Sequence, residues 1–266
     1  MEKVGLIAGN GKLPILFAQV LKQKNLKVTA VAHIGETLDS LEKYVDKIFW
    51  IDLGQLQRII EIFKKEEINN VIMIGGITKA SMFSGIEPDA KAASLLSKLT
   101  HKKDDLLLRS FAKVLEKEGI SVQSATHYFP SILAPKGVLT KNIPTEDQYR
   151  DIKFGWDIAK GIGKLDIGQT VVVKDQVVLA VEAIEGTDEA IKRGGRLGNG
   201  QVVVVKVSKP HQDMRFDIPA VGMETIRSLK EVRGSVLAIE AGNTIILEKE
   251  EMVRFADQEG ISIVAI

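Results

Sequence analysis

The chain of 266 residues contains no cysteine, and only 5% of its residues are aromatic. The absence of cysteine excludes disulfide bonds, thiolate nucleophiles, cysteine-liganded zinc and iron–sulfur clusters. A bound metal ion would therefore need oxygen ligands or the 4 histidines, which are widely separated along the sequence.

The chain also lacks an excess of charge of either sign, since 36 lysine and arginine residues nearly balance 35 aspartate and glutamate residues. The protein as a whole does not attract nucleic acid or an anionic membrane, so we expect no nucleic-acid partner. No apolar run approaches the roughly 20 residues that cross a bilayer. The apolar stretch near the N-terminus is also too short for a signal peptide, so we expect a cytoplasmic protein.

The first half of the chain alternates apolar, strand-like runs with segments of helical periodicity. The strand-like runs are residues 4–8, 28–32, 48–51 and 71–74, and the helical segments are residues 13–24, 56–63 and 106–115. Strands separated by helices indicate βαβ units and a parallel sheet. We therefore predict an α/β protein whose residues 1–127 form a Rossmann-like N-terminal domain.

Residues 128–148 contain three prolines and no sustained periodicity, which predicts a linker. The second half, residues 149–266, is predicted to form a C-terminal catalytic domain of the α+β type with a mixed sheet. Asp175 and Gln176 fit a tight hairpin turn between its first two strands. The elements expected there are a helix at 147–164 and strands at 170–173, 177–183, 202–207, 236–239 and 244–247.

A glycine turn, Gly9-Asn10-Gly11, directly follows the first predicted strand. Glycine in such a turn lets the backbone approach a phosphate, which the N–H groups of the following helix also favour. Pro14 stands where the third glycine of the dinucleotide fingerprint belongs, which argues against NAD, and it also suits the first turn of a helix. A turn without any ligand and a nucleotide-phosphate contact are equally good interpretations.

A second glycine pair ends the strand-like run 71–74, and Lys79 follows three residues later. Ligands of open parallel sheets bind at the carboxyl ends of the strands, where Lys79 would reach an anion. The alternative interpretation is an ordinary solvated loop lysine.

Glu182 lies within the otherwise apolar run 177–183. A buried carboxylate is costly unless it is paired or bound to a metal, so Glu182 is a candidate functional residue, with a structural pair or an exposed position as the alternative. Thr187 is expected to cap the helix that follows. Arg193 and Arg196 either complement the end of that helix, with Gly194 or Gly195 as its C-cap, or join Arg215 in a phosphate-binding arginine cluster.

The segment Lys209-Pro-His-Gln-Asp-Met-Arg-Phe-Asp-Ile-Pro219 follows a fully apolar run. It places two carboxylates, Asp213 and Asp217, around the guanidinium of Arg215. Charges of both signs directly after a buried strand are poorly explained by packing alone. They indicate a site that handles a phosphate, a metal ion or both.

Five motifs occur in order along the chain: GLIAGNGKLP (5–14), LDIGQTVVV (165–173), AVEAIEGTD (180–188), KPHQDMRFDIPAVGMETI (209–226) and IEAGNT (239–244). Together they resemble the LpxI-type UDP-2,3-diacylglucosamine pyrophosphatases, and the resemblance covers essentially the whole chain. It implies a lipid A pathway enzyme with a Rossmann-like N-terminal domain and a distinctive C-terminal domain that holds an essential aspartate. Asp213 and Asp217 are both candidates for that aspartate.

The resemblance further implies hydrolysis of the substrate pyrophosphate to UMP and 2,3-diacylglucosamine 1-phosphate, with Mg²⁺ or another divalent cation such as Mn²⁺. Asp213 and Glu182 are the expected metal ligands, because Mg²⁺ prefers hard oxygen donors. The expected catalytic residues are Asp213, Arg215 and Asp217. The expected substrate-binding residues are Gly9, Asn10, Gly11, Lys79, Thr187, Arg193, Arg196, Lys209 and Gln212.

The two acyl chains of such a substrate require apolar contacts, for which Phe129, Ile132 and Leu133 are candidates if they are not simply core residues. A lipid substrate also implies transient, peripheral contact with the inner-membrane surface, and a homodimer is an expected assembly for a chain of this size. Two other functions remain open: a non-catalytic nucleotide-sugar binding protein, and a dinucleotide-dependent oxidoreductase that the broken fingerprint disfavours.

Overall fold

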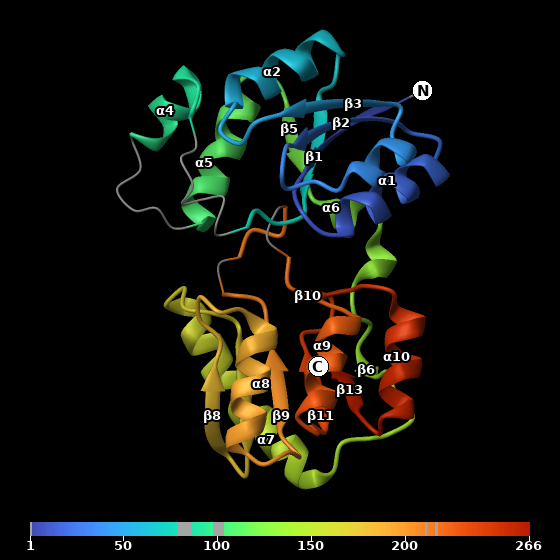
Figure 1. Ribbon diagram of the computed structural model, residues 1–266, viewed down its shortest axis with the longest axis vertical. Coiled ribbons are helices and arrows are strands. Elements are labelled where there is room, and N and C mark those ends of the chain that lie inside the picture. The colour runs from blue at the N-terminus through green and yellow to red at the C-terminus, as the bar shows by residue number, and fades with distance from the viewer. Residues whose placement is uncertain (1, 79–86, 98–103, 211, 216–217) are drawn as a thin grey trace. The chain divides into compact units, whose positions relative to one another are not determined.

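The computed structural model describes residues 2–78, 87–97, 104–210, 212–215 and 218–266 (Figure 1). The chain divides into two compact units. The first unit contains Met1–Pro130 together with Asp213–Asp217, and the second contains Ser131–Gln212 together with Ile218–Ile266. A short segment late in the sequence therefore belongs to the first unit.

A five-stranded parallel sheet forms the centre of the first unit. Its strands are β1 (Lys3–Ala8), β2 (Lys27–His33), β3 (Lys47–Ile51), β4 (Asn70–Ile74) and β5 (Ser121–Gln123). The strand order is β3-β2-β1-β4-β5, and every neighbouring pair is parallel. The order reverses direction between β1 and β4, which is the position where such sheets bind ligands. The predicted Rossmann-like sheet is confirmed.

Helices pack on this sheet through their apolar faces. In α2, Leu56, Ile59, Ile60 and Phe63 are buried at helical spacing, which places them in one apolar cluster with residues of β1 and β2. In α1, Pro14 occupies the first turn, as predicted. The helices of the first unit are α1 (Leu13–Gln23), η1 (Asp39–Tyr44), α2 (Leu56–Lys65), α4 (Ala90–Leu96), α5 (Asp104–Lys117) and α6 (Ala125–Tyr128).

A six-stranded mixed sheet forms the centre of the second unit, as predicted. Its strands are β6 (Gly137–Val138), β7 (Thr170–Lys174), β8 (Val177–Val181), β9 (Val203–Lys206), β11 (Val236–Ile239) and β13 (Ser262–Ala265). The order is β6-β13-β11-β9-β7-β8; β9, β11 and β13 are parallel, and the other pairs are antiparallel. A separate parallel pair joins β10 (Ala220–Val221) and β12 (Ile245–Ile246).

The valine-rich strands of this sheet bury both faces. Val171 and Val205 pack in one apolar cluster with Ile152 of α7 (Glu146–Lys164), while Val172 and Val204 belong to another cluster. The second cluster contains helical residues of α8 (Thr187–Leu197), α9 (Met223–Glu231) and α10 (Lys249–Gln258), and a short helix, η2 (Pro130–Ile132), precedes β6. Among the residues placed by the structure, no helix is long and apolar enough to cross a bilayer.

Local sequence explains the β7–β8 hairpin and the ends of α8. Asp175 and Gln176 both have positive φ values, 51° and 56°, which is the backbone of the predicted tight turn. The expected C-cap of α8 was wrong, because Gly194 and Gly195 lie inside the helix and Gly198 ends it. A side chain at Gly194 would collide with Val172, so this glycine is needed for close packing of helix on strand.

Candidate functional site

Two glycine loops meet at the carboxyl ends of β1 and β4. The N–H of Asn10 donates to the carbonyl oxygen of Gly76 (2.7 Å), and a Cβ at Gly9 would lie 2.2 Å from that same oxygen. Gly11 has a φ of +82°, a region that favours glycine. The glycines therefore have a structural reason to be here, whether or not a phosphate binds beside them.

Glu36 forms hydrogen bonds to both loops, although no sequence motif points to this residue. Its Oε2 accepts hydrogen bonds from Nδ2 of Asn10 (3.1 Å) and from the N–H of Thr78 (2.9 Å), and its Oε1 accepts one from the hydroxyl of Thr78 (2.7 Å). The Glu36 side chain is buried. An acid in the loop after β2 thus fixes the geometry of the switch point in the first unit.

His33, at the end of β2, contacts the end of β1 next to the glycine loop. Its Nδ1 lies 2.9 Å from the carbonyl oxygen of Ala8, and the hydroxyl of Thr37 donates to that oxygen as well (2.7 Å). Burial lowers the pKa of His33, and it outweighs the opposing effects of the hydrogen bond to Ala8 and the charge of Glu36. His33 is consequently a neutral structural residue near pH 7.

Asp213 and Arg215 form a compact ion pair in the first unit. Both Asp213 oxygens accept hydrogen bonds from the Arg215 guanidinium, Oδ1 from Nε (2.9 Å) and Oδ2 from Nη2 (2.8 Å). Nη1 of Arg215 also donates to Glu116 (2.7 Å), and the hydroxyl of Ser124 donates to the carbonyl oxygen of Met214 (2.8 Å). The hydrogen bonds from Arg215 are the main reason that the pKa of Asp213 lies below its usual value.

Glu182 lies just after β8 in the second unit, in a buried polar cluster. Its Oε1 accepts a hydrogen bond from the Thr187 hydroxyl (2.9 Å), and its Oε2 accepts one from the N–H of Gln169 (3.3 Å). The ammonium of the buried Lys206 donates to the same Thr187 hydroxyl (2.8 Å). Thr187 was expected to cap α8, but Gly186 is the N-cap and Thr187 instead links Lys206 to Glu182.

A second polar cluster surrounds Glu240, directly after β11. Its Oε2 accepts hydrogen bonds from Lys160 and from both the N–H and the hydroxyl of Ser208, each at 2.7 Å. Nδ2 of Asn243 donates to the other oxygen (3.0 Å). Burial raises the pKa of Glu240, but the hydrogen bonds from Lys160 and Ser208 outweigh it, and the pKa lies below the usual value. This cluster anchors the segment that begins at Lys209.

The other predicted basic residues that the structure describes are each paired with an acid. Lys209 donates from Nζ to Asp166 (2.7 Å), and its N–H donates to the Gln212 side-chain oxygen (2.8 Å). Arg193 pairs with Glu185 at 2.6 Å, whereas Arg196 lies 3.7 Å from Glu231. Arg193 and Arg196 belong to the second unit and Arg215 to the first. Arg193 and Arg196, which lie three residues apart on α8, therefore pair with different carboxylates, and their association with Arg215 stays a prediction.

The expected metal ligands, Asp213 and Glu182, are not part of a larger cluster of acidic or histidine side chains among the described residues. No group of three or more histidine, aspartate or glutamate side chains is arranged to hold a metal among the residues that the structure describes. Asp213 and Glu182 belong to different units, and protein donors already bind both oxygens of each. Within the described part of each unit, no complete set of protein ligands is present. Two predicted site residues, Lys79 and Asp217, lie outside the described residues.

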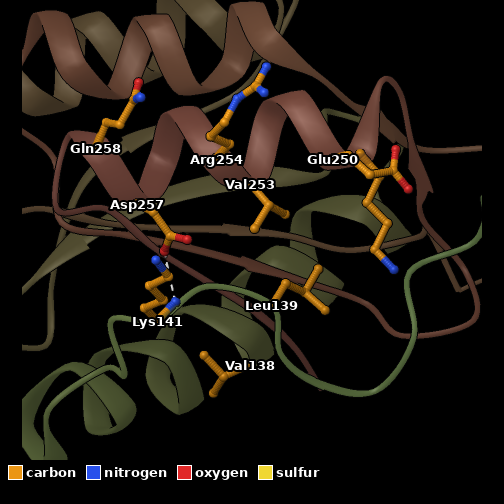
Figure 2. A pocket seen from close by; sticks show the side chains of 9 residues that line it. Val138, Leu139, Lys141, Glu250, Val253, Arg254, Asp257 and Gln258 are labelled. Atoms are coloured by element: carbon orange, nitrogen blue, oxygen red, sulfur yellow. Dashed lines mark hydrogen bonds between the residues drawn. The ribbon is translucent and has the colours of Figure 1, made fainter.

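An open depression in the second unit lies between the loop after β6 and helix α10 (Figure 2). Val138, Leu139 and Val253 supply its apolar lining, and the N–H of Lys141 donates to Asp257 at its edge (2.7 Å). None of the predicted site residues lines this depression. It therefore gives no support to a catalytic role.

Comparison with known proteins identifies the class to which these two units belong. The LpxI N-terminal domain matches residues 3–132, and the LpxI C-terminal domain matches residues 135–264. The chain belongs to the LpxI family, as its motifs predicted, and is an enzyme of the hydrolase class.

One relative is the UDP-2,3-diacylglucosamine pyrophosphatase LpxI of Caulobacter vibrioides. It is 32% identical over 278 residues, and the match covers 100% of this chain and 98% of the relative.

Solved structures show much weaker likeness. The biotin carboxylase subunit of pyruvate carboxylase matches at 12% identity and a TM-score of 0.30, over 70% of this chain and 39% of that chain. UDP-glucose 4-epimerase from Bifidobacterium longum matches at 18% identity and a TM-score of 0.28, over 54% of this chain and 41% of that chain. The matched regions span less than half of these proteins, and we draw no functional conclusion from them.

Proposed function

We propose that the protein hydrolyses the pyrophosphate bond of UDP-2,3-diacylglucosamine to UMP and 2,3-diacylglucosamine 1-phosphate in lipid A synthesis. The observation that carries this proposal is the 32% identity to the Caulobacter vibrioides pyrophosphatase over essentially the full length of both chains. Because both domains take part in that match, the proposal concerns the whole enzyme and not one shared domain.

The Asp213–Arg215 pair supplies the chemistry that such a hydrolysis requires. Water must attack an already anionic phosphorus, so a P–O bond to water forms while a P–O bond of the pyrophosphate breaks. Asp213 is held as a carboxylate, which suits it to orient the attacking water by accepting a hydrogen bond from it. Arg215 carries a guanidinium suited to the phosphoryl oxygens. To reach them, Arg215 must exchange some of its hydrogen bonds with Asp213 or Glu116 for bonds to substrate.

A divalent cation, Mg²⁺ or Mn²⁺, is also part of the proposal. Mg²⁺ sites that handle phosphates commonly use only one or two protein carboxylates, with substrate oxygens and water as the other ligands. Asp213 and Glu182 are each chemically suited to be such a carboxylate. When bound, the cation would neutralise charge on the pyrophosphate.

Release of UMP from UDP-2,3-diacylglucosamine, with and without EDTA, tests the activity and the cation together. We expect release that EDTA abolishes and added Mg²⁺ restores. Uridine-nucleotide binding without UMP release would favour the nucleotide-sugar binding protein, and substrate-dependent reduction of a nicotinamide cofactor would favour the oxidoreductase.

Substitution of the two candidate aspartates tests the site. Asp213→Asn and Asp217→Asn should each lower kcat, by at least about a hundredfold for the residue that handles the attacking water. Asp147→Asn is a matched control, because Asp147 is an exposed aspartate at the start of α7 that pairs with Arg150 on the same helix. Near-normal turnover in both Asp213→Asn and Asp217→Asn would reject this site.

A substrate with two acyl chains is expected to reside in a membrane, so the enzyme must reach it at the membrane surface. We propose that it is a cytoplasmic enzyme that contacts the inner membrane only peripherally. Co-sedimentation with vesicles of anionic phospholipid, compared with vesicles that also contain the substrate, measures that contact.

A further inference from the structure

Three aliphatic side chains stand in solvent at one end of the second unit. Leu165, Ile167 and Ile184 are 67%, 46% and 72% exposed, respectively. We refer to these three residues as the aliphatic rim. Single exposed aliphatic residues are common on protein surfaces, so the rim has meaning only through its local structure and its neighbours.

The turn that carries Leu165 and Ile167 has a defined backbone. Helix α7 ends here, and the N–H of Ile167 donates to the carbonyl oxygen of Ile162 (3.0 Å), as in a Schellman motif. Asp166 occupies the left-handed region with a φ of 60°, where glycine is usually preferred. Its carboxylate accepts a hydrogen bond from Lys209 (2.7 Å), which ties the turn to the start of the proposed site segment.

Strand pairing brings Ile184 to the same place. The N–H of Glu182 donates to the carbonyl oxygen of Thr170 (2.8 Å), which continues the β7–β8 pairing past the end of β8. A Cβ at Gly168 would lie only 2.1 Å from the carbonyl oxygen of Glu182, so the two backbones touch. Ile167 and Ile184 each lie within two residues of this contact, on adjacent segments.

The rim therefore borders the polar cluster of Glu182, Thr187 and Lys206. Lys206 pairs with Thr170 across β7 and β9, which places its strand end beside the same two segments. An exposed apolar surface thus lies next to buried polar and charged groups. This combination suits an amphiphile whose charged head and aliphatic chains must bind side by side.

Other exposed aliphatic residues of this unit lie elsewhere. Val177 and Leu197 are 57% and 67% exposed, but Val177 is in the hairpin end of β8. Leu197 ends α8 next to Gly198, where a Cβ would touch Val202 at the start of β9. Both residues therefore mark the opposite end of the sheet, and they provide a matched comparison for the rim.

We propose that the aliphatic rim binds the acyl chains of the substrate, an inference that rests on the proposed function. The sequence candidates for this role fit less well: Ile132 is buried, and Phe129 packs edge-on against Phe17 with ring centroids 6.0 Å apart. The backbone of Leu133 pairs with Ile245. The rim, by contrast, offers aliphatic surface that water covers until a chain displaces it.

The test compares one triple variant and one double variant, each with two substrates in detergent micelles. The rim variant combines Leu165→Ser, Ile167→Ser and Ile184→Ser, and the control combines Val177→Ser and Leu197→Ser. One substrate carries two long acyl chains, and the other carries two acetyl groups on the same UDP-sugar. We expect the rim variant to raise KM for the long-chain substrate by roughly tenfold or more and to leave the acetyl substrate within about twofold. The control should change neither.

Several results would overturn the proposal. An unchanged KM for the long-chain substrate would do so, and so would an equal rise for both substrates or the same effect in the control. If the rim variant loses activity only on substrate in vesicles, together with loss of vesicle co-sedimentation, the rim contacts the bilayer and not the substrate chains. Isothermal titration with both UDP-sugars in EDTA, where no hydrolysis is expected, measures the chain-length effect on binding, so failure of the hydrolysis itself remains a separate result.

Discussion

Replacement of Glu36 gives a quantitative prediction for the first unit. Glu36→Ala removes the acceptor for three hydrogen bonds, from the side chain of Asn10 and from the N–H and hydroxyl of Thr78. The hydroxyl can turn to another acceptor, whereas the Asn10 amide and the Thr78 N–H lose theirs. With about 1–3 kcal/mol for each of these two donors left without a partner, we expect the free energy of unfolding to fall by about 2–6 kcal/mol. Glu36→Gln keeps the shape and one acceptor oxygen, and should cost about 1 kcal/mol.

The chain offers a convenient reporter for this measurement. It contains 2 tryptophans, of which Trp50 lies in β3 of the first unit and Trp156 in α7 of the second. In a Trp156→Phe background, urea unfolding followed by fluorescence therefore reports on the first unit. We also expect KM to rise more than kcat falls, because Glu36 holds the glycine loops and takes no part in bond breaking.

Glu61→Ala is the matched control, since Glu61 is an exposed acid on α2 of the same unit. It should change the free energy of unfolding by less than about 0.5 kcal/mol. A loss below about 0.5 kcal/mol in Glu36→Ala would refute the reasoning, because the three hydrogen bonds would then have no net value. A Glu36→Gln variant as unstable as Glu36→Ala would refute the part that depends on the retained oxygen.

Two further predictions concern the titratable side chains of Glu240 and His33. Glu240→Ala removes four hydrogen bonds, so the second unit should lose about 2–4 kcal/mol in urea unfolding followed by Trp156. Glu240→Gln should lose less, and equal losses in the two variants would show that the retained shape and oxygen contribute nothing and that the charge accounts for the whole loss. His33 has a pKa below its unfolded value of 6.5, so its contribution is complete above that pH and is lost as pH falls through the lower folded value. Unfolding at pH 7.5 and pH 5 should show this loss, and His33→Gln should reduce the difference; an unchanged difference would contradict the assignment.

The sequence predicted the larger elements because their signals are local. Apolar runs gave β1 to β4 of the first sheet and β7, β8, β9 and β11 of the second, whereas β13 was not predicted. The spacing of buried residues in α2 gave a helix of nearly the right length. Strands β5, β6 and β10 contain only two or three residues. Such short strands are defined by their partners in the sheet, so no local periodicity identifies them.

The polar networks were harder to predict than the fold. Glu36 joins residues 26 and 42 positions away in the sequence, and the partners of Glu240 include Lys160, 80 positions away. No spacing rule encodes pairs of that separation. Lys206 carried the one usable signal, a lysine at the end of a valine run, because an ammonium next to a buried strand needs a partner. Asp213, Arg215 and Glu182 were selected because charged residues near apolar strands are themselves uncommon.

The membership of residues 213–217 in the first unit means that the chain crosses between the units three times, near residues 130, 212 and 217. A single proteolytic cut near residue 131 would therefore separate residues 1–130 from residues 213–217 of the same unit, which would stay covalently attached to the second unit. Separate production of residues 1–130 and 131–266 would also remove the contacts between residues 213–217 and the rest of the first unit. A fragment starting at residue 131 would retain Arg215 and Met214 but lose Glu116 and Ser124, to which they are hydrogen bonded. Neither half of this enzyme is thus a self-contained domain. An active protein made from two fragments would require residues 213–217 of one fragment to bind Glu116 and Ser124 of the other.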